Sequence, residues 1–171
     1  NPGGVAAQWL PLYESDEETV KMQLATFFEV FPNGTVWSNY LNGDGYDLVL
    51  IGQLDNSTIS IDAIQQRLEQ RHYARVACSL AGVAFPSAWD LMATYAGRAS
   101  DLQPMLSRAQ INRDLNMRLQ YIAGWGVNSV SSAQIYRQIL SYRRFPDGLL
   151  TGTGERFEDM REGIGRKHRT F

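Results

Sequence analysis

The fold is decided by residues 5–52, which read VAAQWL PLYESDEETV KMQLATFFEV FPNGTVWSNY LNGDGYDLVL IG. The apolar run at residues 5–10 predicts a buried strand that Pro11 stops. Ser15 with Glu18 three residues later matches a capping box, which predicts a helix start. The apolar residues that follow have the spacing of one face of an amphipathic helix. They are Val20, Leu24, Phe27, Phe28 and Phe31.

Two strand-like runs come after this helix, at residues 35–41 and 47–52. The turn-forming sequence Asn42-Gly43-Asp44-Gly45 separates them, which predicts an antiparallel hairpin. Residues 1–52 therefore predict a strand, a helix and a hairpin, with all three strands in one sheet. A helix that covers only one face of a sheet cannot close a core, so we expect this segment to be the end of a larger α/β sheet.

The pattern after residue 55 is mostly helical. Asp62 with Gln65, and Ser87 with Asp90, match helix N-terminal caps. Gly97 is a candidate C-cap for the second of these helices. We expect a helical module after the sheet.

Three further features complete the expected helical module. Pro104 is expected to interrupt the stretch around it, and Ser132 precedes an amphipathic helix. A last short helix is predicted over residues 157–164. We therefore divide the chain into residues 1–54, the end of the sheet, and residues 55–171, a helical extension.

Charge is spread unevenly over the 171 residues. Residues 1–60 carry eight acids and one base, a balance of −7, although the whole chain carries only −2. The C-terminal tail is basic, with Arg166, Lys167 and Arg169. No nucleic-acid-binding motif accompanies this tail, so we expect a solvated helix end and no nucleic-acid partner.

The single cysteine excludes an intramolecular disulfide. Cys78 lies in an apolar run, so we expect it to be buried and unreactive. These features and the absence of a signal peptide fit a cytoplasmic protein. The chain starts Asn-Pro-Gly-Gly without an initiator methionine, so we expect it to be part of a longer protein.

Motifs for nucleotide, metal and nucleophilic chemistry are weak. Four Gly-x-Gly triplets begin at Gly43, Gly124, Gly152 and Gly163. The first lies in the hairpin, and we expect that the others follow no strand, so all four predict turns and no phosphate cradle. The two histidines and the cysteine lack metal-ligand spacing, and no Gly-x-Ser-x-Gly elbow is present. We expect no catalytic residue, cofactor site or metal site within the chain.

The first 52 residues resemble the polyamine aminopropyltransferases, the spermidine synthase family. The resemblance rests on PGGVAAQW at residues 2–9, the helix that ends FFEVFP at 27–32, and the hairpin that returns to LVLIG at 48–52. Residues 112–121 resemble, with changed acids, a segment of the C-terminal extension of bacterial spermidine-synthase-like proteins, some of which are fused to membrane segments. The resemblance implies the last quarter of a Rossmann-like, methyltransferase-type domain.

The resemblance also implies a reaction. Such a parent protein transfers an aminopropyl group from decarboxylated S-adenosylmethionine to putrescine or a similar amine. Gln8 stands where the family carries a glutamine and is a candidate to orient the amine, and the alternative is that it only holds a neighbouring loop. Trp9, Trp37 and Tyr46 are candidates to wall an alkyl-amine channel, and packing is the alternative for each. The cofactor loop and catalytic aspartates of the family have no counterpart in this chain.

Two other functions remain open on the sequence alone. The helices after residue 55 are candidates for a non-catalytic docking or dimerisation surface. The parent is alternatively a methyltransferase that uses another acceptor. The expected partners are the upstream part of the parent domain, a polyamine substrate, and a second copy of the chain.

Overall fold

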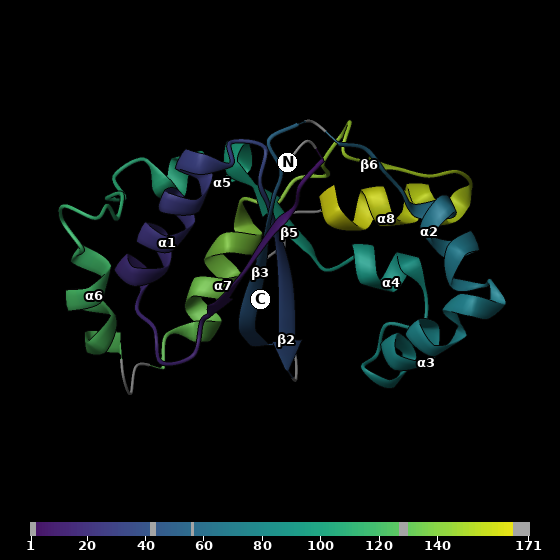
Figure 1. Cartoon of the computed structure of the whole chain (residues 1–171), viewed down its shortest axis with the longest axis horizontal. Helices are drawn as coiled ribbons and strands as arrows, with labels where there is room; N and C mark the ends of the chain where they lie inside the picture. Colours follow the sequence, from purple (N-terminus) through teal and green to yellow (C-terminus); the bar gives the residue numbers. More distant parts are fainter. Residues whose placement is uncertain (1–2, 42–43, 56, 127–129, 166–171) are drawn as a thin grey trace. The chain divides into compact units, whose positions relative to one another are not determined.

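The computed structural model describes residues 3–41, 44–55, 57–126 and 130–165. The chain forms two compact units (Figure 1). The first contains the described residues of 1–56 and 96–143, and the second those of Ser57–Tyr95 and Arg144–Lys167. Residues 96–143 thus pack with the sheet, although the sequence groups them with the helical extension. The basic tail and the turn residues Asn42 and Gly43 lie outside the described residues.

The first unit is built on a four-stranded sheet in the order β1-β3-β2-β5. Strand β3 pairs antiparallel with both β1 and β2, so β1 and β2 run parallel to each other. This confirms the predicted α/β class, the antiparallel hairpin and the sheet of three strands. The elements are β1 (Ala6–Pro11), the crossover helix α1 (Glu17–Val30), β2 (Thr35–Leu41), β3 (Asp44–Gly52) and β5 (Tyr95–Arg98).

Helix α1 begins one residue later than the capping box predicts. Its N-cap is Asp16, whose Oδ1 accepts from the backbone N–H of Thr19 at 2.8 Å. The prediction of Ser15 as N-cap is wrong, because the side chain of Asp16 makes the capping bond; the backbone carbonyl of Ser15 accepts from the hydroxyl of Ser131. The predicted apolar face is confirmed, since the four side chains from Val20 to Phe28 are buried. Their exposed fractions are 0% for Val20, 0% for Leu24, 6% for Phe27 and 8% for Phe28.

The core of the first unit lies on one face of the sheet. Leu48 and Leu50 of β3 pack there with side chains from α1, α5 and α7. These helices lie on the same side of the sheet in Figure 1. Tyr136 of α7 also reaches Ser38 of β2, with 3.3 Å between the two hydroxyl oxygens. The remaining elements of this unit are α5 (Ala99–Leu106), α6 (Arg118–Ile122), η2 (Ala123–Gly126) and α7 (Ser132–Ser141).

Two predicted helix breaks are wrong. Gly97 lies in β5, because the preceding helix already ends at Met92. Pro104 lies inside α5, which continues for two more residues to Leu106. A proline near the end of so short a helix removes only its own bond to Ser100, so the helix tolerates it.

Strand β1 is an edge strand, which corrects the expectation of a buried one. Among the described residues it pairs with β3 alone. Ala7, Gln8 and Trp9 are exposed, and Leu10 is buried in the core. An apolar sequence alone does not distinguish a central strand from an edge strand, because the difference depends on the neighbours.

The free edge of β1 is expected to cause self-association. The strand carries no charge, and its unpaired N–H and C=O groups form a template for another strand. A light-scattering series over protein concentration is expected to show a mass that rises above the monomer value. A constant monomer mass at high concentration would count against this expectation.

The second unit is mainly helical. Its two short strands, β4 and β6, pair in parallel. Helix α4 has the predicted N-cap Ser87, whereas α2 is capped by Ser60 and not by Asp62. The side chain of Gln65 instead accepts from the backbone N–H of Ala88 at 2.9 Å, which ties α2 to α4. The elements are β4 (Ile59–Ser60), α2 (Ile61–Leu68), η1 (Arg71–Tyr73), α3 (Ala74–Gly82), α4 (Ala88–Met92), β6 (Leu150–Thr151) and α8 (Glu155–Gly165).

Helix α3 has no buried residue, and Cys78 on it is exposed. The expectation of a buried Cys78 is therefore wrong, because the apolar run around it meets no partner element closely enough to cover it. In the part of the chain that the structure describes, no helix is both long enough and apolar enough to cross a membrane.

Candidate functional site

Three aromatic rings and one carboxylate gather beside β1 and β3. We call Trp9, Tyr13, Tyr46 and Asp47 the aromatic–acid cluster. The ring centres of Tyr13 and Tyr46 lie 4.7 Å apart in a stacked pair, and those of Trp9 and Tyr13 lie 6.1 Å apart. The indole Nε1 of Trp9 donates to Oδ2 of Asp47 at 2.8 Å. The cluster thus combines π-faces with a negative charge, which is the chemistry that holds an organic cation.

Strand pairing and a β-bulge bring the cluster together. Trp9 pairs with Val49, so it lies on the same face of the sheet as Asp47, two residues along β3. The register between β2 and β3 shifts after Asn39, which pairs with Asp47 while the next pair is Tyr40 with Gly45. Tyr46 is therefore the extra residue opposite β2. Such a bulge redirects a side chain, and here it accompanies the stacking of Tyr46 on Tyr13.

The polar groups of the cluster differ in environment. Asp47 is only 8% exposed, so the hydrogen bond from Trp9 helps to satisfy a largely buried carboxylate. Desolvation raises the pKa of the Tyr13 hydroxyl above its usual value, and the neighbouring Tyr46 and Asp47 raise it further. Tyr13 therefore stays protonated and neutral around pH 7, and Asp47 supplies the negative charge of the cluster.

The structure brings together two of the three residues predicted to bind substrate. Trp9 and Tyr46 both contact Tyr13, with Trp9 55% and Tyr46 42% exposed. Gln8 is exposed, but it pairs with Leu50 and so points to the opposite face of β1 from Trp9. Trp37 lies on the Trp9 face, where its Nε1 donates to Thr35 Oγ1 at 2.9 Å.

Sequence reasoning missed Tyr13 and Asp47. The sequence offered one signal for the site, which was Asp47 itself. An acid at the start of an apolar strand needs a hydrogen-bond or charge partner if it is buried. Trp9 and Asp47 are 38 residues apart in the sequence, so Trp9 could not be identified as the partner of Asp47 without the register between β1 and β3. Tyr13 lies in the link between β1 and α1, where no periodic pattern applies.

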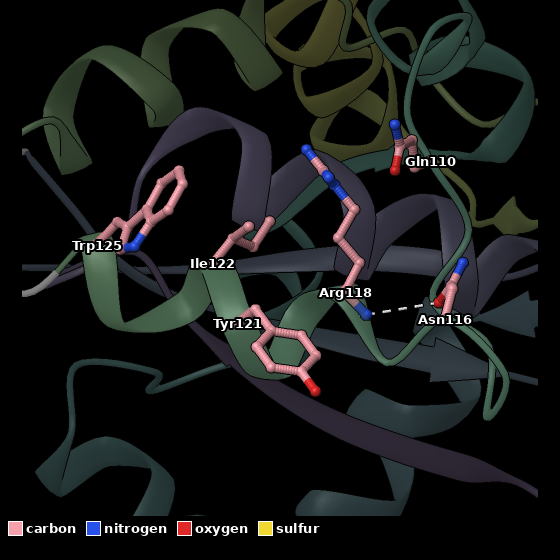
Figure 2. A pocket seen from close by; sticks show the side chains of 6 residues that line it. All are labelled: Gln110, Asn116, Arg118, Tyr121, Ile122 and Trp125. Carbon is pink, nitrogen blue, oxygen red and sulfur yellow. Dashed lines mark hydrogen bonds between the residues drawn. The ribbon is translucent and has the colours of Figure 1, made fainter.

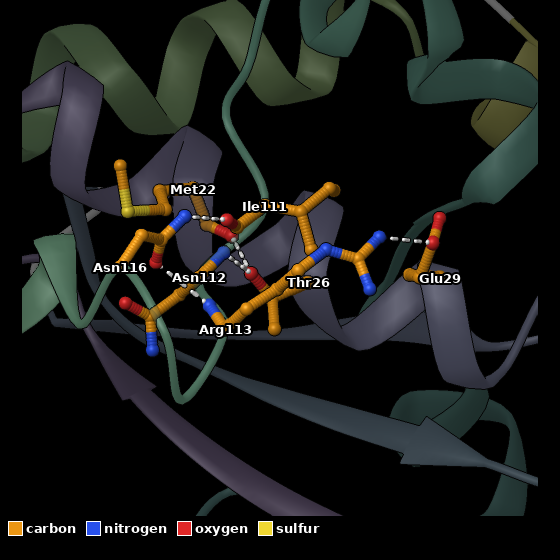
Figure 3. Close-up of polar contacts among 7 residues, drawn as sticks. All are labelled: Met22, Thr26, Glu29, Ile111, Asn112, Arg113 and Asn116. Carbon is orange, nitrogen blue, oxygen red and sulfur yellow. Dashed lines mark hydrogen bonds and ion pairs between the residues drawn. The ribbon is translucent and has the colours of Figure 1, made fainter.

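The segment from Ile111 to Arg118 has a structural role. The backbone N–H of Asn112 donates to Oγ1 of Thr26 on α1 at 2.9 Å (Figure 3). The Oδ1 of Asn112 accepts from the backbone N–H of Leu119 at 2.9 Å. The side chain of Asn116 closes the loop, because it accepts from Arg113 N and donates to Ile111 O. The polar side chains of Asn112 and Asn116 are thus engaged in hydrogen bonds that hold the loop in its conformation.

Two arginines fasten this loop to α1. Arg113 pairs with Glu29, and Arg118 pairs with Glu18, each at 2.8 Å between Nη2 and Oε1. Figure 3 shows the Arg113 side chain reaching along α1 to Glu29. Both pairs are largely exposed, so each contributes little to stability and serves mainly to set the position of the loop.

A pocket of about 430 Å³ is lined by side chains of this loop, of α6 and of η2 (Figure 2). Its volume falls in the usual range for sites of small ligands. The pocket is separate from the aromatic–acid cluster. Its walls are formed by Gln110, Asn116, Arg118, Tyr121, Ile122 and Trp125.

One glycine triplet lies between a strand and a helix, which corrects the expectation that none does. Residues 152–154 follow β6 and precede α8. A Cβ at Gly152 would lie 2.7 Å from Phe157 and 3.1 Å from Trp89, so this glycine is required by packing. The first turn of α8 carries Glu155 and Glu158, which repel an anion. Both features disfavour a phosphate group at this triplet.

No group of three or more potential metal ligands occurs among the described residues. Comparisons of the chain with protein-family models, with curated proteins and with solved structures found no match.

Proposed function

We propose that this chain is the C-terminal part of a spermidine-synthase-like protein whose parent transfers an aminopropyl group to a polyamine acceptor. The observation that carries the proposal is the carboxylate of Asp47 beside the rings of Trp9, Tyr13 and Tyr46. The order strand, helix, hairpin, with β3 between β1 and β2, also supports a Rossmann-like methyltransferase-type sheet.

The cluster suits an aliphatic amine for two reasons. A carboxylate pairs with the protonated end of a diamine through a charge-assisted hydrogen bond. Aromatic faces pack against the alkyl chain and attract the ammonium group. The bond from Trp9 to Asp47 fixes the carboxylate before the amine arrives, which lowers the cost of ordering it.

The cluster would act by positioning. In the proposed reaction the neutral end of the amine attacks the aminopropyl carbon next to the sulfonium of decarboxylated S-adenosylmethionine. A C–N bond forms, the C–S bond breaks, methylthioadenosine leaves, and a base takes the proton of the amine. Asp47 would hold the distal ammonium and orient the attacking nitrogen. The adenosyl group and the base would belong to the upstream part of the parent.

An activity assay of the intact parent protein tests the proposal. The protein is incubated with decarboxylated S-adenosylmethionine and putrescine, and the amine product is measured by mass spectrometry. Formation of spermidine supports the proposal. No aminopropyl transfer, but methyl transfer from S-adenosylmethionine, would instead support the alternative methyltransferase.

Replacement of Gln8 by alanine in the parent is expected to lower turnover by about tenfold or less. Gln8 contributes at most one neutral hydrogen bond, which is worth about 0.5–1.5 kcal/mol. Steady-state kinetics of the variant measures this loss. A loss of several hundredfold would assign Gln8 a larger role than orientation.

Helix α3 favours a second candidate function, a docking module. It has no buried residue, and it exposes Val76 by 48%. A docking module can function even if the parent protein has no catalytic activity. An inactive parent that still binds a protein partner, and loses that partner in the variant Val76→Glu, would favour it.

A further inference from the structure

We propose that the pocket beside α6 binds a small planar aromatic ring that carries a carboxylate. This inference does not depend on the proposed aminopropyl transfer. The pocket opens beside two aromatic side chains, Tyr121 and Trp125, which are 71% and 80% exposed (Figure 2). Tyr121 lies in α6, and Trp125 lies in the 3-10 helix η2 that follows it.

The apolar part of the pocket suits a flat ring. Ile122 is only 4% exposed and forms the apolar base next to the two aromatic side chains. The exposed rings of Trp125 and Tyr121 leave apolar area in water next to this base. A planar ligand that stacks on Trp125 or Tyr121 would remove that area from water.

Two donor groups of the pocket lack a hydrogen-bond partner among the described residues. Within the part of the chain that the structure describes, the indole N–H of Trp125 and the amide of Gln110 have no hydrogen-bond partner. The Oδ1 of Asn116, in contrast, is already occupied by the N–H of Arg113. The ligand that fits these groups is therefore rich in acceptors.

Arg118 supplies the positive charge of the pocket. Its Nη2 bonds to Glu18, while its Nε is buried without an acceptor, so the guanidinium is only partly satisfied. A guanidinium presents paired N–H groups that match the two oxygens of a carboxylate. The same charge disfavours amines, so this pocket and the aromatic–acid cluster select ligands of opposite charge.

Nuclear magnetic resonance of the full chain tests the proposal with three matched probes. Benzoate combines a ring with a carboxylate, benzylamine combines a ring with an ammonium, and acetate is a carboxylate alone. The indole N–H signal of Trp125, assigned through its loss in Trp125→Phe, is followed during each titration. Benzoate is expected to give a saturating shift with a roughly millimolar dissociation constant, as suits so small a ligand. The other two probes are expected to bind at least about tenfold more weakly, because each lacks one of the two interactions.

Three variants separate binding from folding. Trp125→Ala and Arg118→Met are each expected to weaken the binding of benzoate at least about tenfold. Because Trp125→Ala lacks the indole signal, its titration is followed through the backbone N–H signals of α6. The control Glu18→Gln breaks the ion pair with Arg118 but keeps the guanidinium, so benzoate binding is expected to persist or to strengthen. Shifts that do not saturate, an equal response to benzylamine, or benzoate binding that survives Trp125→Ala would each overturn the proposal. A change of oligomeric state in Trp125→Ala without any response to benzoate would identify the surface as a contact between copies, which also overturns it.

Discussion

Replacement of Phe27 by alanine is expected to lower the free energy of unfolding by about 3–5 kcal/mol, the usual cost of a large core truncation. Phe27 is 6% exposed and lies in the main core with Leu24 and Leu50. Its surroundings are tightly filled, since a Cβ at Gly34 would lie 2.9 Å from its ring. The neighbouring chain has little room to collapse into the cavity, so the cost should fall within this range.

Chemical denaturation of the wild type and the variant measures this loss. Val30→Ala is the matched control, because Val30 is on the same helix but 58% exposed. The control is expected to change stability by about 0.5 kcal/mol or less. A loss below about 1 kcal/mol for Phe27→Ala would show that α1 packs differently.

Replacement of Asp47 by asparagine is expected to weaken the binding of putrescine by about tenfold to a hundredfold. A hydrogen bond to a charged group is worth about 1.5–3 kcal/mol, and each 1.4 kcal/mol corresponds to a factor of ten. The amide oxygen of the new side chain still accepts from the indole N–H of Trp9, so the local structure is expected to survive. The change therefore removes the charge and keeps the shape.

Titration of both proteins with putrescine measures the effect. Asp55→Asn removes the same charge from an exposed position of the same unit and is expected to leave the affinity unchanged. Equal weakening in Asp47→Asn and Asp55→Asn would mean that only the net charge matters. If Asp47→Asn binds putrescine with wild-type affinity, the aromatic–acid cluster is not the site that holds the amine.

The elements of residues 3–52 were predictable because each depends on a local pattern. The apolar spacing from Val20 to Phe28 identifies α1, and the turn sequence between two strand-like runs identifies the hairpin. The exact N-cap was not predictable. Ser15 and Asp16 are both good caps, and a bond from Ser131, 116 residues away, accompanies the use of Asp16.

Burial was harder to predict than secondary structure. The run at residues 5–10 and the run around Cys78 are both apolar, yet both are largely exposed. In each case exposure depends on which element packs against the segment, and local sequence does not contain that information. The packing of residues 96–143 against the sheet was also not predictable from local sequence, because contacts such as that of Tyr136 with Ser38 span 98 residues.

The candidate site was predictable only in part. The resemblance suggested Trp9 and Tyr46, but their common neighbour Tyr13 and the carboxylate of Asp47 depend on strand register and on the bulge at Tyr46. The alternation of side chains along β1 also places Gln8 and Trp9 on opposite faces. A glutamine and a tryptophan next to each other in a strand therefore do not act on the same side of the sheet.

Calorimetric titration of the chain with putrescine, S-adenosylmethionine and decarboxylated S-adenosylmethionine tests the central claim most directly. The claim is that this chain carries residues for the amine acceptor and none for the adenosyl group. We expect saturable binding of putrescine with a roughly millimolar dissociation constant, because so small a ligand is held by a single carboxylate. We expect no saturable heat from either adenosyl compound. Saturable micromolar binding of an adenosyl compound, or no binding of putrescine, would contradict the account.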